Sequence, residues 1–471
     1  MSSLSNSSPD PEKKAPYDTN TSHGDPENVI GEVGEIDDHE VFKEGANVNF
    51  RTVGWPRATV IFLKIIFATG VLSIPVAMSS LGAIGGALSV LGWVMLNTYT
   101  AMVQTWRRKS EAGLPKKSLV SAVRTRSTDR QLPGLFIIAY VLCSGSGIVG
   151  VSIGLNALST HAACTVWWAF LATMVVSGTA SVRKFHQIGW LTWAGFISIF
   201  AAVLIVVIAV TTRNRPAAAP ATGEYDLGFY AVAYPSFAAG MVAACTVFVS
   251  SAGTSAFLPV ISEMKNPRDF GKALFLCMSL ITAASLAFSL VVYRWYGQWV
   301  ASPSLGSAGQ TVKMVAYGVG LVGLIVSACL YLHVAAKYCF VRVLRRTRHL
   351  QENTITHWVT WLGLTFGRGA LAFALAMAIP IFQYLIALTG SICFAPLALS
   401  LPGWLWIYDH KSWYKGSALQ QAAFCFHAFL IPLGLFILVG GTYGLVEEII
   451  QAYADGTIGS AFSCADNSGS T

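Results

Sequence analysis

Charged residues are scarce in this sequence. Only 11% of its 471 residues are Asp, Glu, Lys or Arg, and 54% are apolar, whereas soluble domains contain roughly 25% charged residues. A chain with so few charges cannot surround a large core with a water-soluble surface. We therefore expect an all-α integral membrane protein embedded in the lipid bilayer. The net charge of +8 is attributed to membrane topology, and no nucleic-acid partner is expected.

The N-terminal region lacks any apolar stretch that would serve as a secretory signal. Residues 1–50 instead hold 11 of the 23 carboxylates, together with Ser, Pro, Asn and Gly. This composition predicts a disordered cytoplasmic tail.

Motifs for metal binding and catalysis are also missing. The nine cysteines are scattered and form no CxxC pair, so we expect neither a metal site nor a disulfide framework, and no cofactor. Several histidines are isolated, without HxxxH or HExxH spacing: His161, His186, His333 and His357. Without a nucleophile–base pair or paired carboxylates beside the spans, a membrane enzyme is not expected. A channel is not expected either, because no repeated filter motif or charged ring is present.

What the chain does contain is a series of eleven apolar segments of spanning length. Their limits are about 57–80, 82–104, 133–155, 162–180, 187–211, 232–259, 273–297, 312–336, 357–379, 382–407 and 422–446. They define an eleven-span membrane domain over residues 51–450, followed by a short polar tail, 451–471.

Lys and Arg predict the orientation of these spans. With the N-terminus in the cytoplasm, 25 of the 31 Lys and Arg residues fall in cytoplasmic segments and 4 fall outside. Cytoplasmic loops of membrane proteins carry such an excess. Eleven spans then place the C-terminal tail on the extracellular side.

The first span contains helix-breaking residues near its middle. Gly70 is a poor helix former, and Pro75 lacks the amide that would bond back to Val71. A helix interrupted in lipid leaves backbone groups without partners, which is tolerated where the break lines a polar cavity. The stretch therefore predicts either an interrupted helix at a substrate site or a simple kink in a packed helix.

A second stretch of the same kind lies in the sixth span. Gly253 follows Gly70 by 183 residues, and Pro259 follows Pro75 by 184. The first span enters the membrane from the cytoplasm and the sixth from outside. Two interrupted helices at corresponding places, running in opposite directions, indicate a five-plus-five inverted repeat with one additional helix.

Three motifs make the sequence resemble the amino acid/auxin permease family, and within it the fungal neutral amino acid permeases. They are Gly70-Val-Leu-Ser-Ile-Pro75, Phe257-Leu-Pro-Val-Ile-Ser-Glu-Met-Lys-Asn-Pro-Arg-Asp-Phe270 and Ala378-Ile-Pro-Ile-Phe-Gln-Tyr-Leu-Ile-Ala-Leu-Thr-Gly-Ser391. The resemblance covers about residues 51–450 and implies a leucine-transporter-like fold and ion-driven uptake of amino acids. Many relatives carry Gly-x-Gly-x-Leu in the first span, whereas here Ala68 replaces the first glycine.

Interrupted helices suit the two charges of an α-amino acid. Free amides near Gly70 suit the carboxylate, and free carbonyls near Ala68 suit the ammonium. Tyr140 and Phe248 are candidate walls of an apolar pocket, although each alone is also explained by packing. The candidate substrate-binding residues are Ala68, Thr69, Gly70, Val71, Ser73, Tyr140, Phe248, Ser250, Ser251, Gly253 and Thr254. No Asp or Glu lies near mid-membrane, which favours neutral amino acids as substrates. We expect neither Gly70 nor Gly253 to tolerate a side chain.

The residues alone do not distinguish between a proton and a sodium ion as the driving ion. His333 is a titratable candidate, with Lys337 one turn further on, although a structural histidine is the simpler reading. A sodium site could instead use carbonyls of the first span and the hydroxyl of Ser327. The resemblance favours a co-transported proton, because relatives of the fungal group are typically proton-driven.

Three further charged residues need an explanation. Glu263 is a candidate gate at the cytoplasmic end of the sixth span, or a solvated loop charge. Arg368 lies deep in its span and is expected to have a partner or to face a water-filled cavity. Lys64 is expected to extend its ammonium towards the cytoplasm, with a functional role as the alternative.

Two alternatives share the predicted site. A transporter-like amino acid sensor would keep the same residues, and a vacuolar transporter would use the same fold with a different ion. The resemblance favours transport at the plasma membrane.

Overall fold

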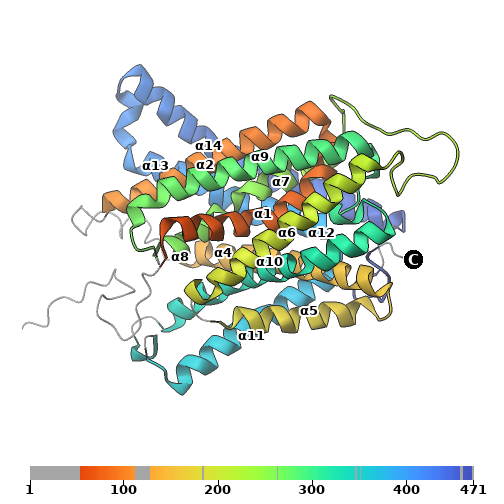
Figure 1. The fold of residues 1–471 in the computed structure, drawn as a ribbon. Helices are drawn as coiled ribbons and strands as arrows, with labels where there is room; N and C mark the ends of the chain where they lie inside the picture. Colours follow the sequence, from red (N-terminus) through yellow and green to blue (C-terminus); the bar gives the residue numbers. More distant parts are fainter. Residues whose placement is uncertain are drawn as a thin grey trace, which may run out of the picture. The chain divides into compact units, whose positions relative to one another are not determined.

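The computed structural model describes residues 53–111, 128–182, 185–262, 264–344, 347–350, 352–456 and 460–468. The predictions for the tail 1–50 and for Glu263 lie outside these residues. Within them the secondary structure is helical, apart from an isolated β-bridge between Val53 and Met264. Most of the long helices run along a common direction (Figure 1).

The first five predicted spans each coincide with one helix. These are α1 (Trp55–Leu81), α2 (Ala83–Glu111), α4 (Thr128–Ser159), α5 (Thr165–Ala180) and α6 (Phe185–Thr212).

The next five spans contain two interrupted ones. The sixth is α7 (Phe237–Ala252), the 3₁₀ turn η1 (Gly253–Ala256) and α8 (Phe257–Ser262). Then follow α9 (Phe270–Tyr296), α10 (Gln310–Leu344) and α11 (Ile355–Ala378). The tenth span is α12 (Phe382–Leu388), the π-helical turns η6 (Thr389–Phe394) and η7 (Pro396–Ser400), and α13 (Leu401–Asp409).

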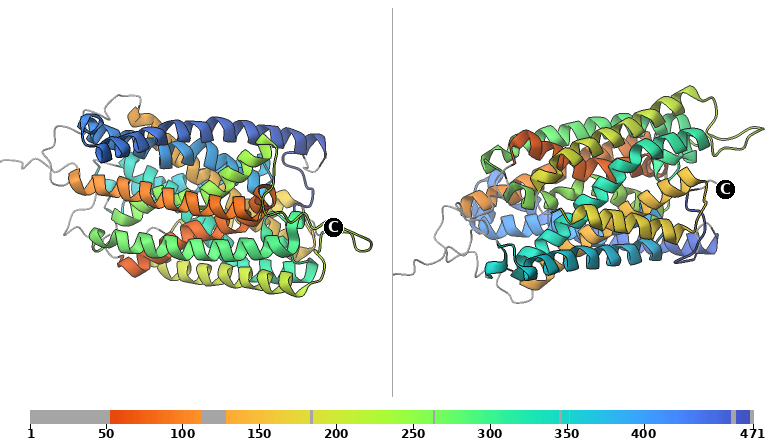
Figure 2. Two further views of the ribbon diagram at one scale, coloured as in Figure 1. Left: turned by 90° about the horizontal axis from the view of Figure 1, so that it is seen from above. Right: turned by 60° about the horizontal axis from the view of Figure 1, so that its bottom comes forward.

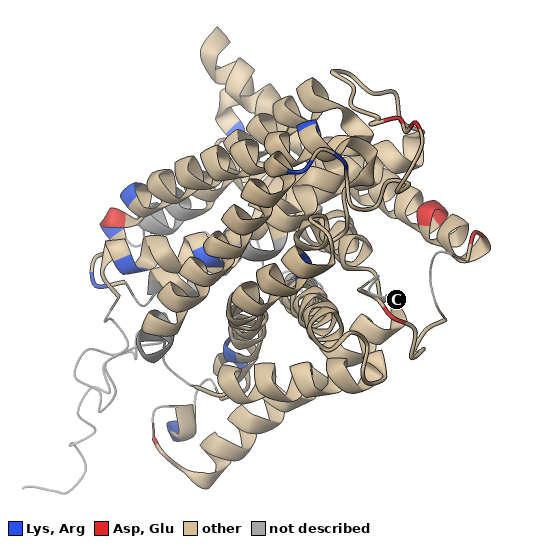
Figure 3. Cartoon of the chain, turned by 45° about the vertical axis from the view of Figure 1, so that its right-hand side comes forward, with Lys and Arg blue, Asp and Glu red and all other residues tan. Residues whose placement is uncertain are grey.

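The eleventh predicted span is α14 (Ala418–Ala454), which runs along the edge of the bundle (Figure 2). By length and composition, eight helical segments of the described residues can cross a membrane, and the bent α1 makes a ninth. The helices α5 and α7 are shorter, with 16 residues each. Charged residues are sparse along the whole bundle (Figure 3).

Local sequence explains where several helices begin. The hydroxyl of Ser236 accepts a hydrogen bond from the Ala239 amide before α7, and Thr354 caps α11 in the same way. Ser417 and Gln420 form a capping box before α14. Such caps satisfy amides that the first helical turn leaves unpaired.

The packing of the helices shows the inverted repeat. Helix α1 packs against α9, and its counterpart α7 packs against α2. In the same way α6 packs against α10 and α12 against α4, while α5 packs against α10 and α11 against α4. Each of these contacts is matched by the equivalent contact with the halves exchanged, as an inverted repeat requires.

The two predicted interruptions differ in the structure. The sixth span breaks at η1, as predicted from Gly253. Helix α1 remains helical throughout and bends by 42° between Trp55–Phe67 and Gly70–Leu81. Of the two alternatives left open by the sequence, the structure shows the kink, and Pro75 lies within the second helical half.

Side chains stabilise the bend of α1. The hydroxyls of Ser73 and Ser250 both donate to the Gly70 carbonyl, at 2.8 and 3.2 Å. Serine hydroxyls of the same and neighbouring helices thus supply hydrogen bonds at the bend, which is how membrane helices tolerate Gly and Pro without unwinding.

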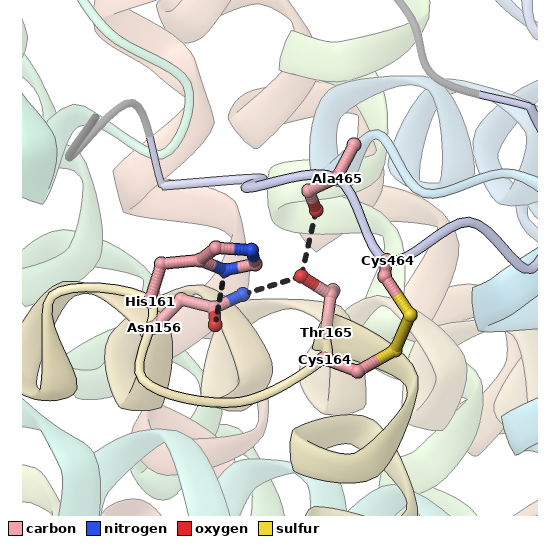
Figure 4. The surroundings of a disulfide bond; sticks show 6 residues. All are labelled: Asn156, His161, Cys164, Thr165, Cys464 and Ala465. Atoms are coloured by element: carbon pink, nitrogen blue, oxygen red, sulfur yellow. Dashed lines mark hydrogen bonds between the residues drawn. A yellow bond between two sulfur atoms is a disulfide. The ribbon is translucent and has the colours of Figure 1, made fainter.

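The expectation of no disulfide is wrong for one pair. Cys164, just before α5, is bonded to Cys464 in the C-terminal segment, 300 residues later (Figure 4). The Thr165 hydroxyl also donates to the Ala465 carbonyl at 2.7 Å. The sequence contains no signal for this pair, because only the return of the tail across the ends of α4 and α5 brings the two cysteines together.

Candidate substrate site

A cavity lies where α1, α4, α7, α10 and the tenth span meet, beside the bend of α1 and the break at η1. The cavity is small in this structure: the space that can hold the centre of a water molecule is about 30 Å³. The lining residues are Ile65, Ile66, Gly70, Tyr140, Cys143, Ser146, Val249, Gly253, Tyr331, Ile386, Thr389 and Phe394. None of these lining residues is charged, and the set combines hydroxyls, backbone at two helix irregularities and apolar side chains.

Gly70 is the point of closest approach between α1 and α7. A Cβ added to Gly70 would lie 2.8 Å from the Cα and 2.9 Å from the Cβ of Ser250. Only glycine fits there, as predicted, but the neighbour is the backbone of α7. At Gly253 an added Cβ would meet only the side chains of Ile65 and Ile66, at 3.6 and 3.7 Å. The protein itself thus leaves room for a methyl group at Gly253, and the expectation that the substrate requires glycine there stays a prediction.

Tyr140 joins the interrupted sixth span to α4. Its hydroxyl lies 2.7 Å from the Ser255 hydroxyl and donates to the Gly253 carbonyl at 3.3 Å. The ring is fully buried and packs edge-on against Phe394, with centroids 5.8 Å apart. Tyr140 thus both walls the cavity, as predicted, and holds the break at η1 in position.

Several lining residues were missed from the sequence. The hydroxyl of Tyr331 on α10 donates to the Ile65 carbonyl of α1. Tyr331 is one helical turn after the candidate Ser327, and a search of that helix face would have found it. Thr389 belongs to the third family motif, but nothing in its spacing showed that the tenth span turns π-helical at that residue.

Three predicted site residues do not face the cavity. Phe248 is fully buried against Trp93 of α2, with ring centroids 4.9 Å apart. The Ser251 hydroxyl accepts a hydrogen bond from the Asn97 side chain at 2.8 Å, also on α2. Val71 is buried in the core.

Ser73 and Ser250 act through the backbone, since both donate to the Gly70 carbonyl. The side chains of Ala68, Thr69 and Thr254 lie outside the described residues, although all three positions flank the bend or the break.

The coupling candidates lie away from the cavity lining. His333 is fully buried, with Nδ1 3.1 Å from the Ala180 carbonyl, and packs edge-on against Trp361. Arg368 has found partners, as predicted: one guanidinium nitrogen donates to the Leu364 carbonyl at 3.3 Å and another to the Cys339 sulfur.

Lys64 does not extend to the cytoplasm, so that expectation is wrong. Its side chain is 0% exposed and points across the bundle to α10, where Nζ donates to the Gly323 carbonyl at 2.8 Å. The Ser327 hydroxyl donates to the same carbonyl at 2.9 Å.

Comparison with known proteins identifies the family of this chain. A model of transmembrane amino acid transporter proteins matches residues 51–447. The chain belongs to this family. This chain is 47% identical over 449 residues to a transmembrane transporter of Gibberella moniliformis, and the alignment covers 95% of this chain and 94% of the relative.

More distant relatives carry more specific names. The N amino acid transport system protein of Neurospora crassa is 24% identical and covers 97% of both chains. The amino acid transporter AVT3C of Arabidopsis thaliana is 23% identical and covers 83% of this chain and 90% of the relative.

Solved structures confirm the predicted fold class. MhsT in complex with L-phenylalanine superposes with a TM-score of 0.50 at 12% identity, covering 84% of this chain and 99% of MhsT. The nucleobase-cation-symport-1 family transporter Mhp1 gives the same TM-score and identity, with coverage of 90% and 98%. Both have the leucine-transporter fold, so this amino acid transporter family member is an all-α membrane protein of that fold.

Proposed function

We propose that this transporter imports neutral amino acids by proton symport, through alternating access at the cavity between α1 and η1. The observation that carries the proposal is the uncharged lining of that cavity. A zwitterion has no net charge, so hydroxyls and helix-end groups are sufficient partners for its two ionic groups.

The ammonium has a partner at the end of α7. Because α7 ends at Ala252, its last carbonyls lack helical partners and carry the negative end of the helix dipole. Val249 and Gly253 bring this end to the cavity. For the carboxylate the cavity offers the hydroxyls of Tyr140, Ser146 and Tyr331, which donate to the Gly253, Cys143 and Ile65 carbonyls in this structure and would have to turn from them to bind substrate.

The rest of the lining suits an uncharged substrate side chain. Ile65, Ile66, Val249, Ile386 and Phe394 form an apolar surface around the polar groups. No carboxylate lies among the lining residues to pair with a lysine or arginine substrate, and an unpaired charge in such a site is costly.

The disulfide and the charge bias together support the proposed orientation and membrane. Disulfides persist on the oxidising side of a membrane, and Cys164–Cys464 joins the start of α5 to the C-terminal segment (Figure 4). This supports an extracellular tail, a cytoplasmic N-terminus and the plasma membrane.

Proton coupling is supported over sodium coupling at the Ser327 position. The Gly323 carbonyl one turn before Ser327 already accepts hydrogen bonds from both Ser327 and the buried Lys64 ammonium. While it is protonated, the Lys64 ammonium next to these oxygens disfavours a second cation by charge repulsion.

Uptake of labelled L-phenylalanine by intact cells carrying this chain tests the proposal. We expect competition by other neutral amino acids and weak competition by lysine and glutamate. Uptake should persist when choline replaces sodium, rise as external pH falls, and stop with a protonophore. Strong competition by lysine, or a sodium requirement, would contradict the substrate class or the ion, and absence of any uptake would favour a sensor or a vacuolar location.

A further inference from the structure

Lys64 is a fully buried amine in the half of α1 that precedes the bend. Its Nζ donates to the Gly323 carbonyl of α10 at 2.8 Å, so a charged group of α1 binds the backbone of another helix in the bundle core. Intramembrane lysines are costly and are retained where they serve a function. No role for this lysine follows from the substrate cavity, because Lys64 does not line it.

The Gly323 peptide joins three helices. Its carbonyl accepts from Lys64 of α1 and from Ser327 of α10. Its amide donates to the hydroxyl of Ser198 on α6 at 3.0 Å, and that hydroxyl donates onwards to the Val319 carbonyl. The lysine therefore binds at a point where α6 and α10 are already connected.

Two glycines make room for the lysine side chain. A Cβ on Gly195 of α6 would lie 3.1 Å from the Lys64 Cε and 2.8 Å from the Val326 Cβ. A Cβ on Gly323 would lie 2.8 Å from the Gly195 carbonyl oxygen. The close approach of α6 and α10 at these glycines thus forms a narrow site that the lysine stem fills.

The helices around Lys64 supply no opposite charge. The sequences of α1, α6, α7, α9 and α10 contain no Asp or Glu, and α2 has only Glu111, at its last residue. The remaining charged side chains and the histidines on these helices are basic. They are Arg57, Lys272, Arg294, Lys313, Lys337, Arg342, His186, His333 and residues 107–109 of α2. Tyrosines 99, 293, 296, 317, 331 and 338 and cysteines 245, 277, 329 and 339 are their other titratable residues.

The basic groups of α10 are remote along the helix. Lys313 and His333 are each ten residues from Gly323, which is about 15 Å at the helical rise. The Lys64 ammonium is therefore bound to a carbonyl and not to a carboxylate. When the ammonium loses its proton, its hydrogen bond to the neutral carbonyl becomes weaker.

The site is directly linked to the substrate cavity. The next residue, Ile65, lines the cavity, and its carbonyl accepts the Tyr331 hydroxyl of α10. Both connections hold the segment Trp55–Phe67 against α10, on one side of the 42° bend. A change in the Lys64 bond thus changes how firmly this half of α1 is held beside the substrate.

We propose that Lys64 carries the co-transported proton, and that its ammonium fastens the first half of α1 to α6 and α10 while substrate is bound. This assignment rests on the proposed proton symport. One proton from external water binds the neutral amine to form the ammonium, and the same proton passes from Nζ to cytoplasmic water when α1 moves away. The empty carrier then returns with a neutral amine, so one proton enters with each amino acid.

The test uses the full-length chain in liposomes with labelled L-phenylalanine. With the outside one pH unit more acidic than the inside and the membrane potential clamped at zero, wild type should accumulate substrate about tenfold, since one unit corresponds to a factor of ten in proton concentration. Lys64→Arg keeps the charge but does not release its proton. It should exchange internal for external substrate within about twofold of wild type, while its accumulation ratio falls to about 1 and its pH dependence disappears.

Lys272→Arg is the matched control, because that lysine is 71% exposed at the start of α9, and it should behave as wild type. If arginine is too large for the site, Lys64→Met provides the second variant, and its remaining transport should be downhill only and independent of pH.

Two outcomes would overturn the assignment: gradient-driven accumulation in either Lys64 variant as in wild type, or loss of exchange in both, which would mark a structural role. Failure of wild type itself to respond to the pH gradient would instead contradict proton symport.

Discussion

Gly70→Ala is the sharpest test of the contact between α1 and α7. The new Cβ would lie 2.8, 2.9 and 3.1 Å from the Cα, Cβ and carbonyl oxygen of Ser250. Carbon atoms pack best at about 3.5–4.0 Å, so the two helices must separate by about 0.7–1 Å. None of these atoms belongs to the end of a flexible side chain, and the backbone itself has to move.

The magnitude follows from two opposing terms. Overpacking costs about 1–3 kcal/mol, whereas alanine improves helix propensity over glycine by up to about 1 kcal/mol. The net loss is up to about 2 kcal/mol, which a protein with a stability of about 5–15 kcal/mol withstands without unfolding. It acts at the cavity wall, however, where the 3.2 Å bond from Ser250 to the Gly70 carbonyl would stretch beyond hydrogen-bond length. We expect uptake to fall about tenfold or more, with normal surface expression.

The assay is initial uptake of labelled L-phenylalanine, normalised to surface protein. Gly92→Ala on α2 is the control, since an added Cβ there has no neighbour within 4 Å. It should transport within about twofold of wild type, a change below about 0.5 kcal/mol. Normal uptake by Gly70→Ala would refute the close-packed interface as a requirement for transport.

Three further predictions concern other parts of the molecule. Tyr140→Phe removes the hydroxyl that contacts Ser255 and Gly253 and should lower uptake about two- to tenfold, as expected for about 0.5–1.5 kcal/mol; unchanged kinetics would argue against its role at η1. Cys464→Ser removes the bond to Cys164 and should lower the unfolding temperature with little change in KM; reducing agent should destabilise wild type but not this variant. An epitope at the C-terminus should be stained on intact cells and one at the N-terminus only after permeabilisation, and the reverse pattern would contradict the orientation.

The fold class could be predicted from sequence because its signals are local in the chain. Apolar length and the Lys and Arg bias require only composition along the sequence. The equivalent positions of Gly70 and Gly253 revealed the inverted repeat, and both glycines line the cavity in the structure. The backbone preferences of glycine are a property of the residue itself, so they can be predicted without a tertiary structure.

The tertiary structure alone decided which neighbours these residues have. Phe248 was an equal candidate with Tyr140 for the cavity wall, but only the rotation of α7 about its axis turns Phe248 towards Trp93. Lys64 looked like a surface-seeking lysine, since nothing in its own segment predicts the carbonyl of Gly323, 259 residues away. The Cys164–Cys464 bond likewise joins residues that are distant in sequence. Contacts between segments depend on how helices pack in three dimensions, whereas spans and breaks depend on short-range properties of the chain itself.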